Sequence, residues 1–218
     1  MNIRILIPAV TALLICGCVS TEYIEVDRTM PPYFHPKNFR VSSEGRDALP
    51  RRVMVLPSFG KADVMTLRDI DELLVQELTK ANAFEVVLPS RADVQPRRNE
   101  EEFTLEEALP WAAKEGADGI LICRITSCSP HRPLLLGTAM KLWNIPKQTM
   151  PWAIDETLDS QLTLVANGAR NYYLSEFRAA YPNRRSESIL ESPRMFFQYV
   201  FSELFTTLPG APKIPENP

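Results

Sequence analysis

The sequence predicts an α/β fold: a single three-layer-type domain in which β-α-β-α-β is followed by an antiparallel hairpin and two C-terminal helices on a mixed sheet. The first observation is that short apolar runs alternate with helical patterns between residues 52 and 125. This alternation is typical of parallel strands joined by right-handed crossovers. The second is that two strand patterns follow Ser129-Pro130 without a helix between them, which adds antiparallel strands to the sheet.

The first strand of the domain is the apolar run at residues 53–56. A run that is apolar at every position is typical of a strand buried on both faces. In the helix expected next, leucine and isoleucine recur at helical spacing up to Leu78, and Asn82 lies near its end. Thr66 and Asp69 are placed like a capping box for this helix.

The second strand is the β-rich run at residues 84–88, and the charged segment 90–102 after it is expected to be a surface loop. Thr104 and Glu107 then have the spacing of a capping box and start a second helix. Because Pro110 lies inside that helix, we expect it to kink the helix or to shift its start.

The third strand, at residues 120–125, completes the alternating part of the domain. The strand patterns at residues 134–144 and 150–157 are the two arms of a hairpin around residues 145–148. The sheet is therefore expected to carry its antiparallel strands on one side.

Two helices complete the domain. Asp159 or Ser160 is expected to cap the first of them, whose apolar face is formed by Leu162, Val165, Ala169, Tyr173 and Phe177. Ser192 followed by Pro193 has the pattern of an N-cap with proline at the first helical position. The helix that they start carries Phe196, Phe197, Val200, Leu204 and Leu208.

The N-terminus has the pattern of an export signal, in which Arg4 precedes an apolar run at residues 5–15. This run is shorter than the 20 or so apolar residues that span a bilayer. The segment that follows, Leu14-Ile15-Cys16-Gly17-Cys18, resembles the lipobox of bacterial lipoproteins. The alternative is an ordinary signal peptide that happens to contain cysteines.

The lipobox resemblance implies that Cys18 receives a diacylglycerol, that the signal is cut before it, and that its new amino group is acylated. Cys18 fits the pattern better than Cys16 because Gly17 precedes it. Since two or more acyl chains anchor a protein stably, the domain would stay at a membrane. In such lipoproteins an aspartate directly after the lipidated cysteine favours retention in the inner membrane. Here that residue is Val19, so the resemblance points to the outer membrane, with the domain in the periplasm.

These patterns divide the chain into a signal peptide (1–17), a lipidated N-terminus with an extended spacer (18–50), the α/β domain (51–209) and a Pro-rich tail (210–218). Prolines in the spacer favour extended conformations. Its aromatic content is higher than a linker needs, so part of it is expected to pack on the domain or on a partner.

The charge and the cysteines exclude several classes of protein. A formal net charge of −3 offers no electrostatic footprint for nucleic acid, and the sequence contains no polybasic run for anionic lipid. If Cys123 and Cys128 share a strand, they lie about 16 Å apart, too far for a disulfide. We therefore interpret both as buried thiols.

The search for catalytic groups yields little, so we expect no catalytic residue, no cofactor and no metal. His35 and His131 have no second ligand at metal-binding spacing and are interpreted as solvated loop histidines. Ser58 and Gly60 follow the first strand, at an end where α/β sheets often bind ligands, although a plain turn explains them better.

Acidic residues offer one alternative, a carboxylate-dependent hydrolase that uses Asp155, Glu156 and Asp159. Asp155 and Glu156 would point to opposite faces of a strand, and helix capping explains Asp159, so an active site here is the weaker hypothesis.

The tryptophans offer another possibility. Trp143 and Trp152 flank the hairpin turn; core or hairpin packing is the default interpretation, but an exposed tryptophan there would mark a contact surface.

The order of elements resembles the small α/β domain of envelope lipoproteins related to the curli-secretion protein CsgG, with the activator lipoprotein LpoB and the N-terminal domain of TolB similar in fold. The resemblance covers roughly residues 52–209. It is carried by Val53-Met54-Val55-Leu56-Pro57, Leu73-Leu74-x-x-Glu77-Leu78, Phe84-Glu85-Val86-Val87 and Ala117-Asp118-Gly119-Ile120-Leu121.

The resemblance implies a periplasmic, non-catalytic domain that works through protein contacts, as an adaptor or assembly factor in the cell envelope, with self-association one possibility. A subunit of an oligomeric export ring is the alternative. Transmembrane strands need about 9–11 residues with one lipid-facing side, and Pro146 and Pro151 argue against that role for the hairpin.

Overall fold

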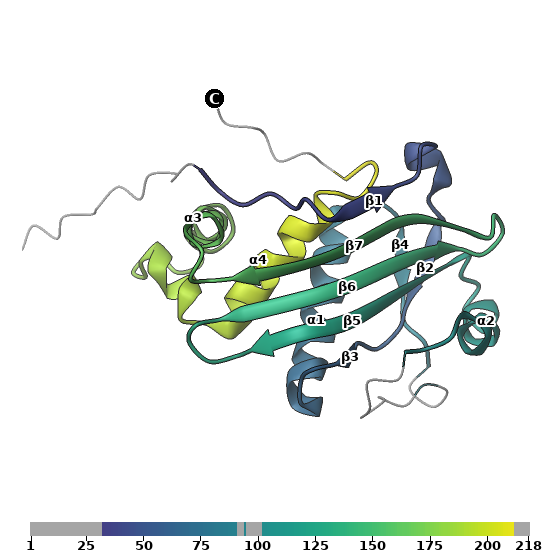
Figure 1. The fold of residues 1–218 in the computed structure, drawn as a ribbon, viewed down its shortest axis with the longest axis horizontal. Helices are drawn as coiled ribbons and strands as arrows, with labels where there is room; N and C mark the ends of the chain where they lie inside the picture. Colours follow the sequence, from purple (N-terminus) through teal and green to yellow (C-terminus); the bar gives the residue numbers. More distant parts are fainter. Residues whose placement is uncertain (1–31, 91–93, 95–101, 212–218) are drawn as a thin grey trace, which may run out of the picture.

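The structure, a computed structural model, describes residues 32–90, 94 and 102–211. One mixed sheet of seven strands runs in the order β1-β7-β6-β5-β2-β4, with β3 paired to β5 (Figure 1). The strands are β1 (Phe39–Val41), β2 (Arg52–Val55), β3 (Phe59–Gly60), β4 (Glu85–Val87), β5 (Gly119–Ser129), β6 (Leu135–Asn144) and β7 (Thr149–Asp159). The helices are α1 (Val64–Ala81), α2 (Leu105–Lys114), α3 (Thr163–Tyr172) and α4 (Pro193–Phe205), with 3-10 turns η1 (Gly45–Ala48) and η3 (Ser186–Leu190) and a π-helical turn η2 (Tyr173–Phe177).

The parallel half of the sheet confirms the alternating pattern of the sequence. β2 lies parallel to both β4 and β5, with Val53 opposite Val86 on one side and Gly119 on the other. Val53, Met54 and Val55 are at most 3% exposed. The prediction of a first strand buried on both faces is therefore confirmed.

The antiparallel half is formed by β5, β6 and β7. The turn between β6 and β7 falls at residues 145–148, as predicted for the hairpin. β5 continues to Ser129, beyond the predicted strand, so Cys123 and Cys128 lie on one strand and both are free. Cys123 is buried and Cys128 is half-buried.

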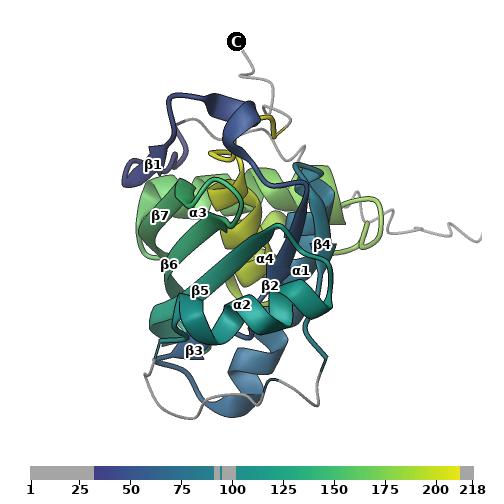
Figure 2. The ribbon, with the colours of Figure 1, turned by 90° about the vertical axis from the view of Figure 1, so that its right-hand side faces the viewer.

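Two hydrophobic cores lie on opposite faces of the sheet because successive residues of β2 point in opposite directions. Val53 and Val55 face the larger core beneath α1, α3 and α4, whereas Met54 and Leu56 face a smaller core beneath α2. α1 lies beside α4 (Figure 2), whereas α2 lies at the end of the molecule away from α3 (Figure 1). Three layers thus exist only over the parallel half. Among the described residues, α2 covers the end of β5 that carries Ile120 and Ile122, and no helix covers the part of the same sheet face that carries exposed Arg124 and Asp155 (Figure 1).

Residues 32–50, assigned from sequence to the spacer, pack on the domain. Their β1 pairs antiparallel with β7, with Phe39 opposite Ile154, and Ala48 of η1 is 1% exposed. The sequence did not predict β1, since a three-residue strand is too short to show an alternating pattern. The folded unit therefore includes this segment.

Helix starts differ from the predictions at two places. The N-cap of α1 is Asp63, whose carboxylate accepts hydrogen bonds from the N–H groups of Met65 and Thr66, and not a Thr66 and Asp69 box. Both Asp63 and Thr66 offer a side-chain oxygen that can accept hydrogen bonds at the start of a helix. The helix begins after Asp63, the earlier of the two. Asn82, in the left-handed conformation, ends α1.

The start of α3 is the second difference. Neither Asp159 nor Ser160 caps it, because β7 extends to Asp159, and the N-cap is Leu162 without a side-chain hydrogen bond. Asp159 instead accepts a hydrogen bond from the backbone N–H of Gln161.

Two predicted caps are confirmed. Thr104 and Glu107 form the capping box of α2, which begins at the predicted place and continues through Pro110. The proline removes one backbone hydrogen bond from the helix. Ser192 caps α4 by accepting a hydrogen bond from Met195, with Pro193 in the first turn.

Candidate functional site

Cys18, the predicted lipidation site, lies outside the described residues, as do the signal peptide and most of the predicted surface loop at 90–102. Pro32 is the first described residue. Within the described part, no helix is long and apolar enough to cross a membrane. The structure bears on the predicted anchor through the segment that follows it, residues 32–42.

One end of this segment is held by α3. The side-chain amide of Asn167 donates a hydrogen bond of 3.0 Å to the carbonyl of Pro32. The backbone N–H of Phe34 donates one of 3.0 Å to the carbonyl of Leu164. Asn167 is 8% exposed, so its amide is a buried polar group with a defined partner.

The other end is held by β7 through Glu156. This carboxylate accepts hydrogen bonds from the backbone N–H groups of Lys37 at 2.5 Å and Asn38 at 2.7 Å. The side-chain amide of Asn38 donates in return to the carbonyl of Asp155 at 2.8 Å. Residues 32–42 therefore cross from α3 to the edge of the sheet with contacts at both ends.

Between these ends, His35 approaches α4. Its Nδ1 lies 3.5 Å from a carboxylate oxygen of Glu203. Glu203 is 8% exposed, and burial raises its pKa from 4.5 to about 7. His35, interpreted from sequence as a solvated histidine, remains exposed but contacts a buried acid. His131 is exposed.

Tyr199 lies one turn before Glu203 on α4. Burial, and secondly the charge of Glu203, raise the pKa of its hydroxyl. The hydroxyl has no hydrogen-bond partner among the described residues. It faces Gly168 of α3 so closely that a Cβ atom there would lie 2.3 Å from the oxygen. Glycine at 168 is thus required for α3 to pack against α4.

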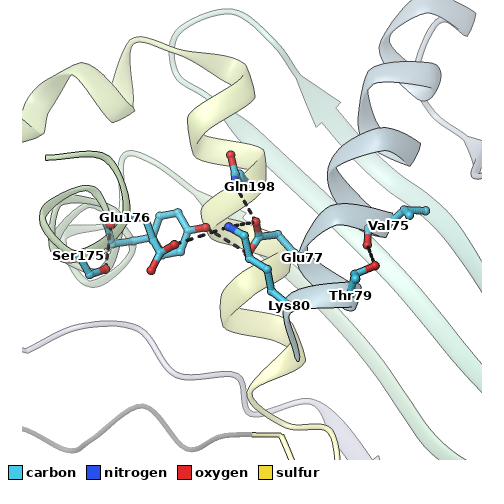
Figure 3. Close-up of polar contacts among 8 residues, drawn as sticks. Val75, Glu77, Thr79, Lys80, Ser175, Glu176 and Gln198 are labelled. Carbon is cyan, nitrogen blue, oxygen red and sulfur yellow. Dashed lines mark hydrogen bonds and ion pairs between the residues drawn. The ribbon is translucent and has the colours of Figure 1, made fainter. Parts of the chain in front are cut away.

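A second polar cluster joins α1, α3 and α4 (Figure 3). Its centre is Glu77, which is 3% exposed. Its carboxylate accepts hydrogen bonds from Gln198 at 2.7 Å and from the Tyr172 hydroxyl at 3.2 Å. Lys80 forms an ion pair with it at 2.7 Å and lies 3.6 Å from Glu176. Because each of these groups has a hydrogen-bond or ion-pair partner within the cluster, the cluster is explained as a structural contact between the helices.

The acids proposed for a hydrolase do not converge. Asp155 and Glu156 are successive residues of β7 and point to opposite faces. Glu156 binds the backbone of residues 37 and 38, and Asp159 binds the backbone of Gln161. None of the three lines the hollow at residues 184–192 or the smaller one on the sheet at Ile122, Arg124 and Ala139. The arrangement that the hydrolase hypothesis requires is therefore not formed.

Trp152 does not belong to a contact surface. Its side chain is fully buried between the sheet and α4, and its indole N–H donates to the Thr207 hydroxyl at 2.9 Å. The default interpretation, packing in the core or hairpin, is therefore confirmed for Trp152, and Leu142 opposite it in β6 faces the same large core. Trp143 points to the other face and is half-buried, so it alone remains a candidate contact residue.

Ser58 and Gly60 are likewise explained by packing. The backbone N–H of Ser58 donates to Asp71 at 2.8 Å, and Gly60 lies in β3 opposite Ile125. A Cβ atom at residue 60 would lie 2.3 Å from the carbonyl oxygen of Ile125, so the close strand contact requires glycine.

Burial raises the pKa of nearby Cys123 to about 12, which makes it an unreactive thiol. In the described part, no group of three His, Cys, Asp or Glu side chains is placed to hold a metal.

No protein-family model and no curated protein matches the chain. Among solved structures, the PelC dodecamer from Paraburkholderia phytofirmans is 15% identical with a TM-score of 0.42, covering 76% of this chain and 95% of that one. Lipoprotein GNA1162 from Neisseria meningitidis is 13% identical with a TM-score of 0.41, covering 62% and 98%. The LpoB C-terminal domain from Salmonella enterica is 14% identical with a TM-score of 0.33, covering 49% and 81%.

These neighbours include lipoproteins, and LpoB is one of the proteins that the sequence resemblance names. At such identities and TM-scores, the likeness does not assign the chain to a family. The function is therefore argued from the chain's own residues.

Sequence reasoning missed the residues that hold segment 32–42. Glu156 was considered only as an acid in a cluster, and Asn167 and Glu203 were not singled out. The available signal was that each is polar at a place where helical or strand periodicity predicts a half-buried side chain. Their common partner, more than a hundred residues earlier for Glu156 and Asn167, left no trace in the spacing.

Proposed function

We propose that the chain is a lipid-anchored protein of the bacterial cell envelope, acylated at Cys18, whose domain acts as a non-catalytic adaptor or assembly factor. The observation that carries the proposal is the lipobox pattern at residues 14–18, followed after a short interval by a domain that binds the chain leading to it. The domain would face the periplasm, with the outer membrane favoured over the inner.

The short interval limits where the domain can be. Thirteen residues separate Cys18 from Pro32, so a fully extended chain reaches at most about 50 Å. A spacer ending at residue 50 would have allowed more than twice this distance. A domain confined within this distance of the membrane meets envelope partners at high effective concentration, so that even weak contacts with them can form a stable complex.

The lipidation step is tested by metabolic labelling of the full chain with an alkyne analogue of palmitate, followed by separation of membrane and soluble fractions. Cys18→Ala is expected to lose the label and to accumulate as uncleaved precursor, because the acylated cysteine is also the cleavage site. Cys16→Ala is the matched control and should keep the label. Loss of label in Cys16→Ala alone, or labelled Cys18→Ala protein, would contradict the proposal.

The adaptor role is tested by crosslinking in intact cells, followed by purification of the acylated protein and measurement of its native mass. A specific partner of different sequence is the expected result. A closed homo-oligomer without another protein would instead favour the export-ring alternative. Recovery of neither a partner nor a self-associated form would refute the adaptor role.

A further inference from the structure

A hollow of about 570 Å³ lies between η3 and the start of α4. It is lined by Arg184, Arg185, Glu187, Ser188, Glu191 and Ser192. Both glutamates are already paired with arginines. Glu187 lies 3.5 Å from Arg170, and Glu191 lies 2.5 Å from Arg132.

The two arginines of the hollow have no such carboxylate. Arg184 and Arg185 are both exposed. The guanidinium of Arg184 lies 5.1 Å from the centre of the Tyr181 ring, and the guanidinium of Arg185 makes no hydrogen bond or ion pair to any described residue. Residues 178–194 contain four arginines against two glutamates in a chain of net charge −3. The hollow is therefore a positive site on an otherwise acidic protein.

The hollow lies at the end of the domain where the N-terminal segment enters. Asn167, which donates to Pro32, also accepts a hydrogen bond of 3.3 Å from Arg170. Arg170 in turn pairs with Glu187 in the wall of the hollow. Two side chains thus connect the first described residue to the hollow. Figure 1 shows α3 and the chain that joins it to α4 at one end of the molecule, with the β6–β7 turn at the other.

We propose that the Arg184 and Arg185 hollow is a membrane-contact surface that binds the phosphate of anionic lipid headgroups. The inference rests on the proposed lipidation of Cys18, because the tether brings this end of the domain within about 50 Å of the bilayer. Guanidinium groups bind phosphate oxygens in pairs of parallel hydrogen bonds. Two such groups are a weak site in solution, but a tether turns their binding into an intramolecular step.

The surface corrects an expectation from sequence. No polybasic run was found, because only two of the basic residues at this end are adjacent in the chain. The fold withdraws the acidic neighbours of Arg184 and Arg185 into ion pairs with Arg170 and Arg132. The charge that remains is visible only in three dimensions.

The test uses the acylated full-length protein, purified from membranes and reconstituted in phosphatidylcholine vesicles with or without phosphatidylglycerol. A fluorophore is attached at Asn183→Cys beside the hollow, or at Thr149→Cys at the opposite end, in a Cys128→Ser background. Quenching by a headgroup-labelled lipid reports proximity to the bilayer. Stronger quenching at 183 than at 149, dependent on phosphatidylglycerol, is expected.

Arg184→Ser with Arg185→Ser should remove this difference. Each basic residue at an anionic surface contributes a factor of about five, so loss of both is expected to weaken docking about 25-fold. Arg40→Ser with Arg124→Ser, on the open sheet face, is the matched control and should leave quenching unchanged. Equal quenching at 183 and 149, or no dependence on phosphatidylglycerol, would overturn the inference. Failure of the protein to float with any vesicle would instead refute lipidation at Cys18.

Discussion

Glu156 and Glu203 both contact the N-terminal segment, but they differ in burial. Glu156 accepts two backbone hydrogen bonds from a half-buried position. Glu203 is buried with one contact of 3.5 Å to His35, and burial favours its neutral form. The first residue holds the segment through backbone hydrogen bonds, whereas the charge of the second depends on pH.

Replacing Glu156 with alanine is expected to loosen residues 32–42 and to lower the free energy of unfolding by about 1–2 kcal/mol, because two hydrogen bonds to a charged acceptor are lost. Limited proteolysis should cut within this segment earlier than in the native protein. The matched control is Asp155→Ala, whose side chain accepts no bond from the segment. Equal sensitivity of the two variants would show that Glu156 does not hold it.

The raised pKa of Glu203, about 7 instead of 4.5, predicts that stability falls as the pH rises through this interval. The folded protein binds a proton there that the unfolded chain has lost, so unfolding becomes easier with each pH step and levels off above about 7. The total loss in the free energy of unfolding from this group is about 3 kcal/mol.

Glu203→Gln should remove this slope, because glutamine stays neutral. Urea unfolding at pH 5 and pH 8 measures it: the variant is expected to match or exceed the native protein at pH 8 and to gain nothing at pH 5. An unchanged pH dependence in Glu203→Gln would assign the slope to another group.

At the scale of elements, the helical layer depends on one polar contact as well as on apolar packing. Glu77 of α1 bonds Tyr172 of α3 and Gln198 of α4, so a single carboxylate meets all three helices on that face (Figure 3). Apolar packing alone tolerates sliding of one helix past another. A buried polar group with defined partners selects one arrangement.

Glu77→Ala is expected to cost about 2–4 kcal/mol, because the Tyr172 hydroxyl and the Gln198 amide are left buried without a partner. Chemical denaturation measures the loss. Glu176→Ala removes a partly exposed carboxylate 3.6 Å from the same Lys80 and should cost less than about 1 kcal/mol. Comparable losses in the two variants would mean that the cluster acts only through surface charge.

The elements that could be predicted are those whose own residues repeat an apolar pattern at helical or strand spacing. β2, α2, the β6–β7 hairpin and α4 each carry apolar spacing together with a cap or turn signal. The start of α3 was misplaced because β7 continues two residues beyond its apolar pattern. β1 and β3 were missed because strands of three and two residues are defined by their partners and not by their sequence.

At the scale of the whole molecule, the sheet is unevenly supported. β5 pairs with β2 on one side and with β6 over ten positions on the other, whereas the edge strand β1 has three positions paired. Protection of backbone groups should follow this order, since local opening is easiest where few contacts must break.

Native-state hydrogen exchange read by mass spectrometry is therefore expected to show peptides of β1 exchanging first and peptides covering residues 120–125 last. The protection of β5 should approach the global stability. If β1 peptides exchanged together with those of β5, the N-terminal segment would be part of the cooperative core.

The candidate sites also show what a sequence can predict. A lipobox is a contiguous motif, so its cysteine was found without a structure. The hollow at Arg184 and Arg185 depends on ion pairs of Glu187 with Arg170 and of Glu191 with Arg132, whose partners lie 17 and 59 residues apart in the chain. No local pattern records that pairing.

The docking of residues 32–42 has a mechanical consequence. If the anchor on Cys18 is pulled, force enters the domain at Pro32 and loads the contacts to Asn167, Leu164 and Glu156 before it reaches the core. These few hydrogen bonds would break first, while the sheet stays folded. Their release frees the chain as far as Asn38, directly before β1, and this raises its maximum reach from about 50 Å to about 70 Å. A protein held between a membrane and a distant partner could thus extend under tension without unfolding.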